Sequence, residues 1–284
     1  SAGKWLRETI SAAWPRVQEI GMHPDASMER LRTVDSIEEL SKSADFIQES
    51  APERLDLKIK LLERIDEAAD VSVLIASSTS GLLPTQLQSK CKSPMRVLVG
   101  HPFNPVYLLP LVEVVGGART AESAIDRASQ IYTDLGMHPL RIRKEVPGFI
   151  ADRLQEALWR EALHLVNDGL ATPEELDKAI FLGPGLRWAF WGTCLIFHLA
   201  GGAGGMRQML EHFNPALFPW SRLEAPLIRD SLVSSMAAGC DECAQGQTVR
   251  ELEAIRDKTL VAVLKTLQEQ DIGAGQVINE FGRS

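Results

Sequence analysis

Val71-Ser-Val-Leu-Ile-Ala76 is a short apolar run, and the small hydroxyl residues Ser77-Ser-Thr-Ser80 follow it at once. A run of this length and composition is typical of a strand buried on both faces of a sheet. Further runs that read as strands lie at residues 45–49, 96–100, 111–115 and 140–143. The stretch between residues 53 and 69 has apolar side chains every three to four positions, which is typical of an amphipathic helix. This alternation predicts an α/β domain with a largely parallel sheet.

The second half of the chain shows a different pattern. Pro147-Gly148 opens a long run with helical periodicity, and almost no strand pattern follows it. The sequence therefore predicts an α/β domain over residues 1–145 and an all-α domain over residues 146–284. Gly201-Gly-Ala-Gly-Gly205 lies in this helical context. We expect a turn between helices there, because a phosphate loop of the dinucleotide type lies between a strand and a helix.

The bulk composition favours a globular protein with a small-molecule substrate. The 284 residues include 45% apolar and 24% charged residues, and the net charge is −8. This acidic balance argues against a nucleic-acid partner or an anionic membrane surface. No apolar run is long enough for a membrane span, and the start of the chain lacks the apolar run of a signal peptide.

Cysteine usage points to a reducing compartment. Four cysteines in a chain of this length are too few for a disulfide scaffold, which favours the cytoplasm. Cys240 and Cys243 form a CxxC pair without a second pair or a nearby His. We therefore expect two ordinary helical cysteines and no metal site.

Three residues of the first half suggest a catalytic site. Ser80 and His101 follow predicted strands, and ligands of open α/β sheets bind beyond the carboxyl ends of the strands. Glu113 lies within the apolar run Leu111-Val-Glu-Val-Val115, where an ionised carboxylate is costly without a partner. A hydrogen bond from the His101 ring to Glu113 would leave the other ring nitrogen free to take a proton from a substrate hydroxyl. The alternatives are a structural His101 and a Glu113 that faces solvent.

Four motifs carry a resemblance to a known family. SSTSGL (77–82), GHPFNP (100–105), LVEVVGG (111–117) and KEVPGFIADRL (144–154) resemble, in order and spacing, the 3-hydroxyacyl-CoA dehydrogenases. The resemblance extends from about Ile37 to Gln268. It implies a Rossmann-type doubly wound parallel sheet that binds NAD, followed by a helical domain through which the family forms homodimers.

The resemblance also implies roles for individual residues. His101 matches the catalytic base of the family, Glu113 the carboxylate that orients it, and Ser80 the hydroxyl near the reacting substrate oxygen. Three further residues match cofactor-binding positions: Asn104 matches a residue near the nicotinamide end, and Glu53 and Lys58 match positions beside the nicotinamide ribose and the substrate. Without the resemblance, Glu53 and Lys58 would be interpreted as an acidic helix start and an exposed lysine.

Two further stretches narrow the expected substrate. NPVYLLPLVEVVGG (104–117) and GLRWAFWG (185–192), the latter with HLAGGAGGMRQML (198–210), look most like family members that oxidise L-carnitine. Members that act on L-gulonate, with the related lens λ-crystallins, are the nearest alternative, and an acyl-CoA substrate is another. Carnitine and gulonate are 3-hydroxy acids without coenzyme A, and carnitine carries a quaternary trimethylammonium group.

One departure from the family pattern bears on the substrate. Acyl-CoA-specific members usually have Asn where this chain has Asp152, and an ionised Asp cannot donate a hydrogen bond to a thioester carbonyl. Asp152 would favour a nearby cation, or it could form an ion pair on the helix surface. Arg153 or Arg187 could bind the substrate carboxylate, and the sequence does not distinguish between them.

Aromatic residues could recognise the quaternary ammonium group through their ring faces. Trp188, Phe190 and Trp191 form the densest aromatic cluster of the chain, and Tyr107 is a weaker candidate. The alternative is that these rings pack in a core or a dimer interface.

The printed chain lacks the strand and G-x-G-x-x-G turn with which a Rossmann domain opens. We expect a preceding segment of about 30–45 residues, the size of a βαβ unit, and the choice of NAD over NADP rests on the resemblance alone.

Two other classes of function compete with a dehydrogenase. One is a non-catalytic structural protein on the same fold, and the other is an isolated helical interaction domain.

Overall fold

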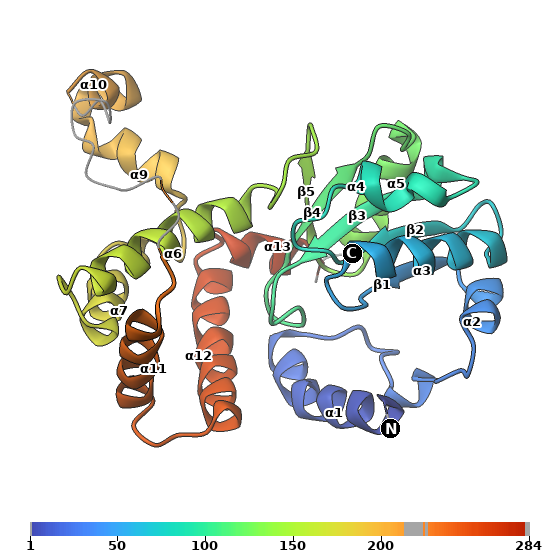
Figure 1. Cartoon of the computed structure of the whole chain (residues 1–284), viewed down its shortest axis with the longest axis horizontal. Coiled ribbons are helices and arrows are strands. Elements are labelled where there is room, and N and C mark those ends of the chain that lie inside the picture. Colours follow the sequence, from blue (N-terminus) through green and yellow to red (C-terminus); the bar gives the residue numbers. More distant parts are fainter. Residues whose placement is uncertain (1, 213–223, 225–226, 282–284) are drawn as a thin grey trace. The chain divides into compact units, whose positions relative to one another are not determined.

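The computed structural model describes residues 2–212, 224 and 227–281. It divides into two compact units (Figure 1). The first unit runs to Asp152 and also includes the chain from Gln276 onward, and the second spans Arg153–Gly275. The sequence predicted a domain boundary between residues 145 and 146. It did not predict that the C-terminal helix belongs to the first unit.

The first unit is built on one five-stranded sheet with the order β1-β2-β3-β4-β5. The strands are β1 (Phe46–Glu49), β2 (Leu74–Ser77), β3 (Val97–Pro102), β4 (Leu111–Gly116) and β5 (His138–Ile142). β1, β2 and β3 run parallel, β4 is antiparallel to β3, and β5 is parallel to β4. Residues 103–110 are too short a connection for a parallel crossover, so the chain reverses direction there. The predicted α/β class and largely parallel sheet are confirmed.

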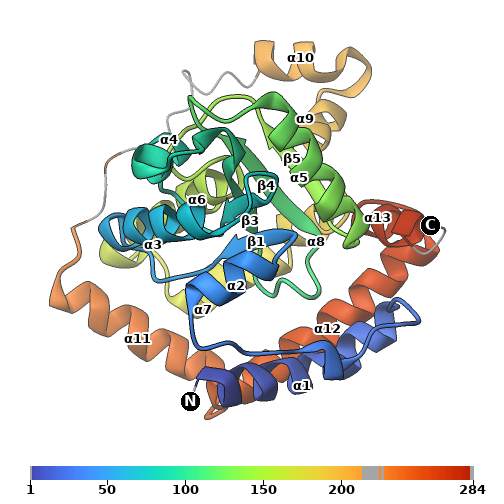
Figure 2. The same ribbon diagram turned by 90° about the vertical axis from the view of Figure 1, so that its right-hand side faces the viewer.

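Helices cover both faces of this sheet. The first unit contains α1 (Ala2–Ile20), η1 (Met28–Arg30), α2 (Ile37–Ser43), α3 (Leu55–Ala68), α4 (Pro84–Leu87), η2 (Gln88–Lys90), η3 (Pro94–Arg96), α5 (Glu122–Asp134) and most of α13 (Ala274–Phe281). Figure 2 shows α3 and α5 on opposite sides of the strands. Ile75 belongs to the same buried cluster as Leu62 of α3, whereas its neighbour Leu74 belongs to the cluster that contains Ala128 of α5. This alternation follows from the strand period of two, which points successive side chains to opposite faces.

A buried ion pair joins α3 to the start of β3. The Arg96 guanidinium donates to the Asp66 carboxylate at 2.9 Å and to the Ala69 carbonyl at 3.3 Å, and both charged side chains are buried. Arg96 thereby satisfies carbonyls that the end of a helix leaves without partners. The pair fixes the helix against the strand that leads to His101.

The second unit is entirely helical in its described residues. Its elements are α6 (Ala151–Asn167, which begins in the first unit), α7 (Pro173–Phe181), α8 (Pro184–Trp188), α9 (Thr193–Ala200), η4 (Gly202–Gly204), α10 (Gly205–His212), α11 (Asp230–Ala244) and α12 (Val249–Glu269). Thr172 and Thr248 start α7 and α12 with capping boxes. Residues 201–204 connect α9 to α10, which begins at Gly205, so the predicted turn between helices is present.

Two further observations concern the described residues. No helix among them combines the length and the apolar character that a membrane crossing requires. Cys240 is a free, exposed residue of α11, and the side chain of Cys243 lies outside the part that the structure describes.

Candidate active site

His101 and Glu113 are direct partners across the β3–β4 pair. The His101 Nδ1 atom lies 3.0 Å from Glu113 Oε2, and both side chains are buried. The predicted hydrogen bond is therefore present, and Glu113 does not face solvent. Because Nδ1 faces a carboxylate, it carries the proton in the neutral ring, and Nε2 is left with its lone pair.

The second oxygen of Glu113 is held by the start of α6. The backbone N–H groups of Ile150 and Ala151 donate to Glu113 Oε1 at 2.9 and 3.0 Å. Burial raises the pKa of Glu113, but the hydrogen bonds from His101, Ala151 and Ile150 together outweigh burial and hold that pKa below its ordinary value. Glu113 is thus an anion stabilised by two backbone amides and one imidazole.

A left-handed turn delivers these two amides. Gly148 and Phe149 have φ values of 72° and 48°, and Phe149 is the residue immediately before Ile150. Left-handed backbone is unfavourable for a bulky residue, so packing must compensate for it. The Phe149 ring is fully buried and its centroid lies 5.7 Å from that of His101. Phe103 contacts the His101 ring as well, with centroids 4.9 Å apart.

Asp152 lies near the reactive nitrogen of His101. Its Oδ2 atom is 3.8 Å from His101 Nε2, and its side chain is 31% exposed. Burial raises the pKa of Asp152, the positive charge of His101 lowers it and the charge of Glu113 raises it, and the resulting pKa is above the ordinary value. The sequence placed Asp152 near the substrate but did not indicate that it approaches the ring itself.

These features fit proton abstraction by an imidazole, and comparison with known proteins gives the family. Residues 4–146 match the model for the 3-hydroxyacyl-CoA dehydrogenase NAD-binding domain, and residues 148–239 match that for the C-terminal domain. The chain belongs to the 3-hydroxyacyl-CoA dehydrogenase family. It is accordingly an NAD-dependent oxidoreductase that acts on a CH–OH group.

Curated relatives are similar over most of the chain. L-carnitine dehydrogenase of Pseudomonas putida is 54% identical over 271 residues, which cover 95% of this chain and 84% of the relative. The enzyme of the same name from Pseudomonas aeruginosa is 57% identical over 265 residues, or 93% and 83% of the two chains. Among solved structures, the NAD⁺-dependent dismutase 5-formyl-3-hydroxy-2-methylpyridine 4-carboxylic acid 5-dehydrogenase matches with a TM-score of 0.79 and 26% identity. That match covers 93% of this chain and 87% of the dismutase.

Ser80 follows β2 in a loop that Glu53 holds. The Ser80 N–H donates to Glu53 Oε1 at 3.1 Å, and the Thr79 hydroxyl donates to the same oxygen. Ser80 is exposed, and the Glu53 side chain is 47% exposed just before α3. The structure therefore joins two predicted site residues of this 3-hydroxyacyl-CoA dehydrogenase relative at one edge of the sheet.

The interpretation of Lys58 as an exposed lysine is wrong. Its ammonium group is buried, donates to Glu49 at 3.0 Å and to the Ala51 carbonyl at 2.8 Å, and lies 3.7 Å from Glu53. Buried Glu49 was missed by the sequence argument, and it also accepts from the Ser77 hydroxyl. The sequence signal for Glu49 is weaker than that for Glu113, because Glu49 ends the short strand β1, whereas Glu113 lies inside an apolar run.

A second polar network joins three strands beside His101. Gln48 of β1 donates to the Ser78 hydroxyl at 2.7 Å and to the Gly100 carbonyl at 2.9 Å, and it accepts from the Tyr132 hydroxyl at 2.6 Å. Burial raises the pKa of Tyr132. Gly100 precedes His101, and a Cβ at this position would collide with the Tyr132 ring. The network therefore fixes the backbone from which the His101 side chain projects.

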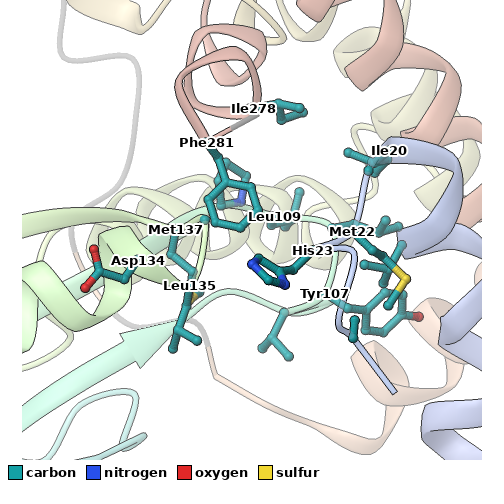
Figure 3. A pocket seen from close by; sticks show the side chains of 17 residues that line it. Ile20, Met22, His23, Tyr107, Leu109, Asp134, Leu135, Met137, Ile278 and Phe281 are labelled. Carbon is teal, nitrogen blue, oxygen red and sulfur yellow. The ribbon is translucent and has the colours of Figure 1, made fainter. Parts of the chain in front are cut away.

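Asn104 and Tyr107 lie in the loop between β3 and β4. Asn104 is exposed. Tyr107 contributes to the wall of an apolar cavity of about 490 Å³, to which the end of α1, the turn between α5 and β5, and α13 also contribute (Figure 3). Neither His101 nor Glu113 lines this cavity. The role of Asn104 near the nicotinamide stays a prediction.

The aromatic cluster lies in the second unit. Phe190 and Trp191 contact each other edge to face, with centroids 5.0 Å apart, whereas Trp188 ends α8 and is 41% exposed. The ring contacts of the described residues include none between Trp188 and these two. Recognition of the quaternary ammonium group by Trp188, Phe190 and Trp191 stays a prediction.

Proposed function

We propose that this protein oxidises the 3-hydroxyl group of L-carnitine to the ketone of 3-dehydrocarnitine. The observation that carries the proposal is the buried His101–Glu113 pair, which leaves one imidazole nitrogen as a base for an alcohol proton. The similarity to L-carnitine dehydrogenases supports the choice of substrate. Gulonate or a 3-hydroxyacyl-CoA is the alternative substrate.

NAD⁺, when it is bound, would accept the hydride from the substrate. Glu53 fits the nicotinamide end of this cofactor, because its partly exposed carboxylate stands beside Ser80 at the carboxyl edge of the parallel strands. Buried Lys58 donates to Glu49 and lies near Glu53, so we assign it to holding Glu53 in place. Asn104 would approach the nicotinamide from the loop after β3.

The residues of the chain provide the acid–base part of the reaction. His101 Nε2 takes the hydroxyl proton, because an alcohol is too weak an acid to lose it unaided at neutral pH. Glu113 stabilises the imidazolium that forms and holds the ring with its Nδ1–H toward the sheet. Phe103 and Phe149 restrict water around the ring. Ser80 orients the substrate oxygen.

Recognition of the trimethylammonium group needs negative charge and aromatic faces. Asp152 brings a partly exposed carboxylate to the reactive end of the site, which favours a cation and disfavours a thioester carbonyl. Trp188, Phe190 and Trp191 are the candidate rings, each worth about 0.5–2 kcal/mol per cation–π contact. Arg153 and Arg187 are the two candidates for the substrate carboxylate.

A substrate panel tests the proposal. The full-length protein is mixed with NAD⁺ and, in turn, with L-carnitine, L-gulonate and 3-hydroxybutyryl-CoA, and the absorbance of NADH is followed. We expect turnover with carnitine alone. Turnover with gulonate or the acyl-CoA instead would reassign the substrate, and silence with all three would favour a non-catalytic structural protein.

The same panel tests the role of Asp152 in specificity. Asp152→Asn should lower the ratio of carnitine to acyl-CoA turnover, since it removes the charge that favours the cation and adds a donor for the thioester. An unchanged ratio would contradict this role.

We also propose that the molecule is a cytoplasmic homodimer. Residues 1–145 would form the NAD-binding domain, and residues 146–284 the substrate and dimerisation domain. The helical unit exposes large apolar side chains, including Leu154, Trp159 and Phe181, which a partner subunit would cover. Light scattering coupled to size exclusion tests the dimer, and a monomer at micromolar concentration would contradict it.

A further inference from the structure

The imidazole of His101 has a carboxylate near each of its nitrogen atoms. Glu113 of β4 lies 3.0 Å from Nδ1, and Asp152 at the start of α6 lies 3.8 Å from Nε2. The distance between Nδ1 and Glu113 is that of a hydrogen bond, whereas the distance between Nε2 and Asp152 is too long for one. Nε2 is therefore close to a negative charge without being committed to it, and a substrate hydroxyl can still reach its lone pair.

We propose that Asp152 is the proton outlet of the site: it accepts from His101 Nε2 the proton that His101 has taken from the substrate, and releases it to water. The proposal rests on the proposed function for the oxidation step. The pairing of Asp152 with the ring, however, is a property of the protein without substrate, so it can be measured separately.

Glu113 and Asp152 differ in their hydrogen bonds and in their exposure to solvent. Both oxygens of Glu113 accept hydrogen bonds and the residue is fully buried, so Glu113 has neither a free oxygen nor a path to water. The side chain of Asp152 is 31% exposed. Glu113 therefore holds the charge of the imidazolium, and Asp152 connects the ring to solvent.

The electrostatic surroundings favour a proton on Asp152 more than on Glu113. His101 from β3 and Glu113 from β4 are titratable groups that act on Asp152. Burial and the charge of Glu113 together outweigh the positive charge of His101 and raise the pKa of Asp152. Burial of Glu113 is outweighed by the hydrogen bonds that it accepts from His101 and the backbone, and these lower its pKa. A proton that leaves the imidazolium therefore costs less on Asp152.

The sequence of bonds balances. The substrate O–H bond breaks as its proton binds to Nε2 of His101. The C–H bond of the carbon that carries this hydroxyl group also breaks, and its hydrogen passes as a hydride to NAD⁺. The Nε2–H bond then breaks as an O–H bond forms on Asp152, and this proton leaves to water. The sum is one alcohol and one NAD⁺ converted to one ketone, one NADH and one proton.

The first test is a titration of the His101 ring by nitrogen NMR in the full-length protein without substrate, with the signal assigned from the spectrum of His101→Gln. Asp152→Asn should move the midpoint of the ring titration to lower pH by about one unit, because a nearby negative charge favours the imidazolium. Asp152→Glu should retain most of the wild-type midpoint. Asp45→Asn, which removes an exposed carboxylate before β1, should change nothing.

Asp152 also lies in the first turn of α6, where an acidic residue stabilises the helix dipole. A purely structural role of this kind would change the melting temperature of Asp152→Asn and leave the ring midpoint where it is in the wild type. That result would overturn the proposal.

The second test is kinetic. Asp152→Asn should lower kcat about tenfold or more and move the acid limb of kcat/KM to lower pH, and formate should partly restore the kcat of Asp152→Ala. Wild-type kcat and an unmoved acid limb in Asp152→Asn would overturn the proposal. A shifted ring titration in a protein that turns over none of the three substrates would support the pairing and reject the proposed function.

Discussion

Glu113 stands directly opposite His101 in the antiparallel pair of β3 and β4, and its far oxygen receives the first amides of α6. A strand, a second strand and a helix start thus hold the base from three directions. Groups on regular elements are placed more rigidly than groups on loops, so the ring is oriented before any substrate arrives.

His101→Ala removes the base. We expect kcat to fall by at least about a hundredfold, because a positioned general base contributes that much or more. The affinity for NAD⁺ should change little, since the ring stands at the alcohol side of the site. Steady-state kinetics and fluorescence titration with NADH measure the two quantities. An equal loss of cofactor affinity would contradict the role.

Glu113→Gln keeps the shape of the side chain and removes its charge. We expect kcat to fall by about a hundredfold or more, as the imidazolium loses its stabilising anion, with a smaller change in KM. Glu145→Gln is the matched control, because Glu145 accepts a hydrogen bond from the backbone of Thr85 and does not contact His101. A wild-type kcat in Glu113→Gln would contradict the role of the His101–Glu113 pair in catalysis.

Acid stability should also depend on Glu113. Its pKa is lower in the folded protein than in the unfolded chain, where it is about 4.3. The ionised carboxylate therefore stabilises the fold fully above that value, and this contribution is lost as the pH falls through the folded pKa. Urea unfolding between pH 3 and 6 should show a gap between wild type and Glu113→Gln that narrows toward the acid end. A gap that stays constant would contradict the assignment.

The buried pair of Arg96 and Asp66 should dominate the stability of the α3–β3 junction. Arg96→Met leaves the buried Asp66 carboxylate without its cationic partner, which costs about 3–5 kcal/mol in the free energy of unfolding. Arg64→Met breaks an exposed pair with Glu38 and should have a much smaller effect. Denaturant titration of the two variants compares them, and similar losses would contradict the prediction.

Gly100→Ala should disturb the strand end that carries His101. The added methyl group collides with the Tyr132 ring, and overpacking of this kind costs about 1–3 kcal/mol. Gly81→Ala is the control for stability, because its Cβ would meet the nearest atom, the Gly148 nitrogen, at 3.6 Å. A Gly100→Ala protein as stable as the Gly81→Ala protein would show that Tyr132 moves aside freely.

Local patterns were sufficient for much of the fold. Runs of apolar residues predicted the five strands, and the loss of this pattern after Val146 predicted the helical second half. These features depend on the period of the backbone, which is 2 in strands and 3.6 in helices, so they can be read within one segment. A carboxylate in an apolar strand demands a partner, and this demand identified Glu113 as part of the site.

Tertiary structure alone decided the surroundings of those residues. The antiparallel direction of β4, the left-handed turn at Phe149, the burial of Lys58 against Glu49 and the approach of Asp152 to Nε2 are features that the motifs did not predict. Each of them depends on packing or pairing between segments. Sequence determined which side chains could do the chemistry, and only the packed fold determined which of them meet, because a distance between remote segments leaves no periodic trace in the chain.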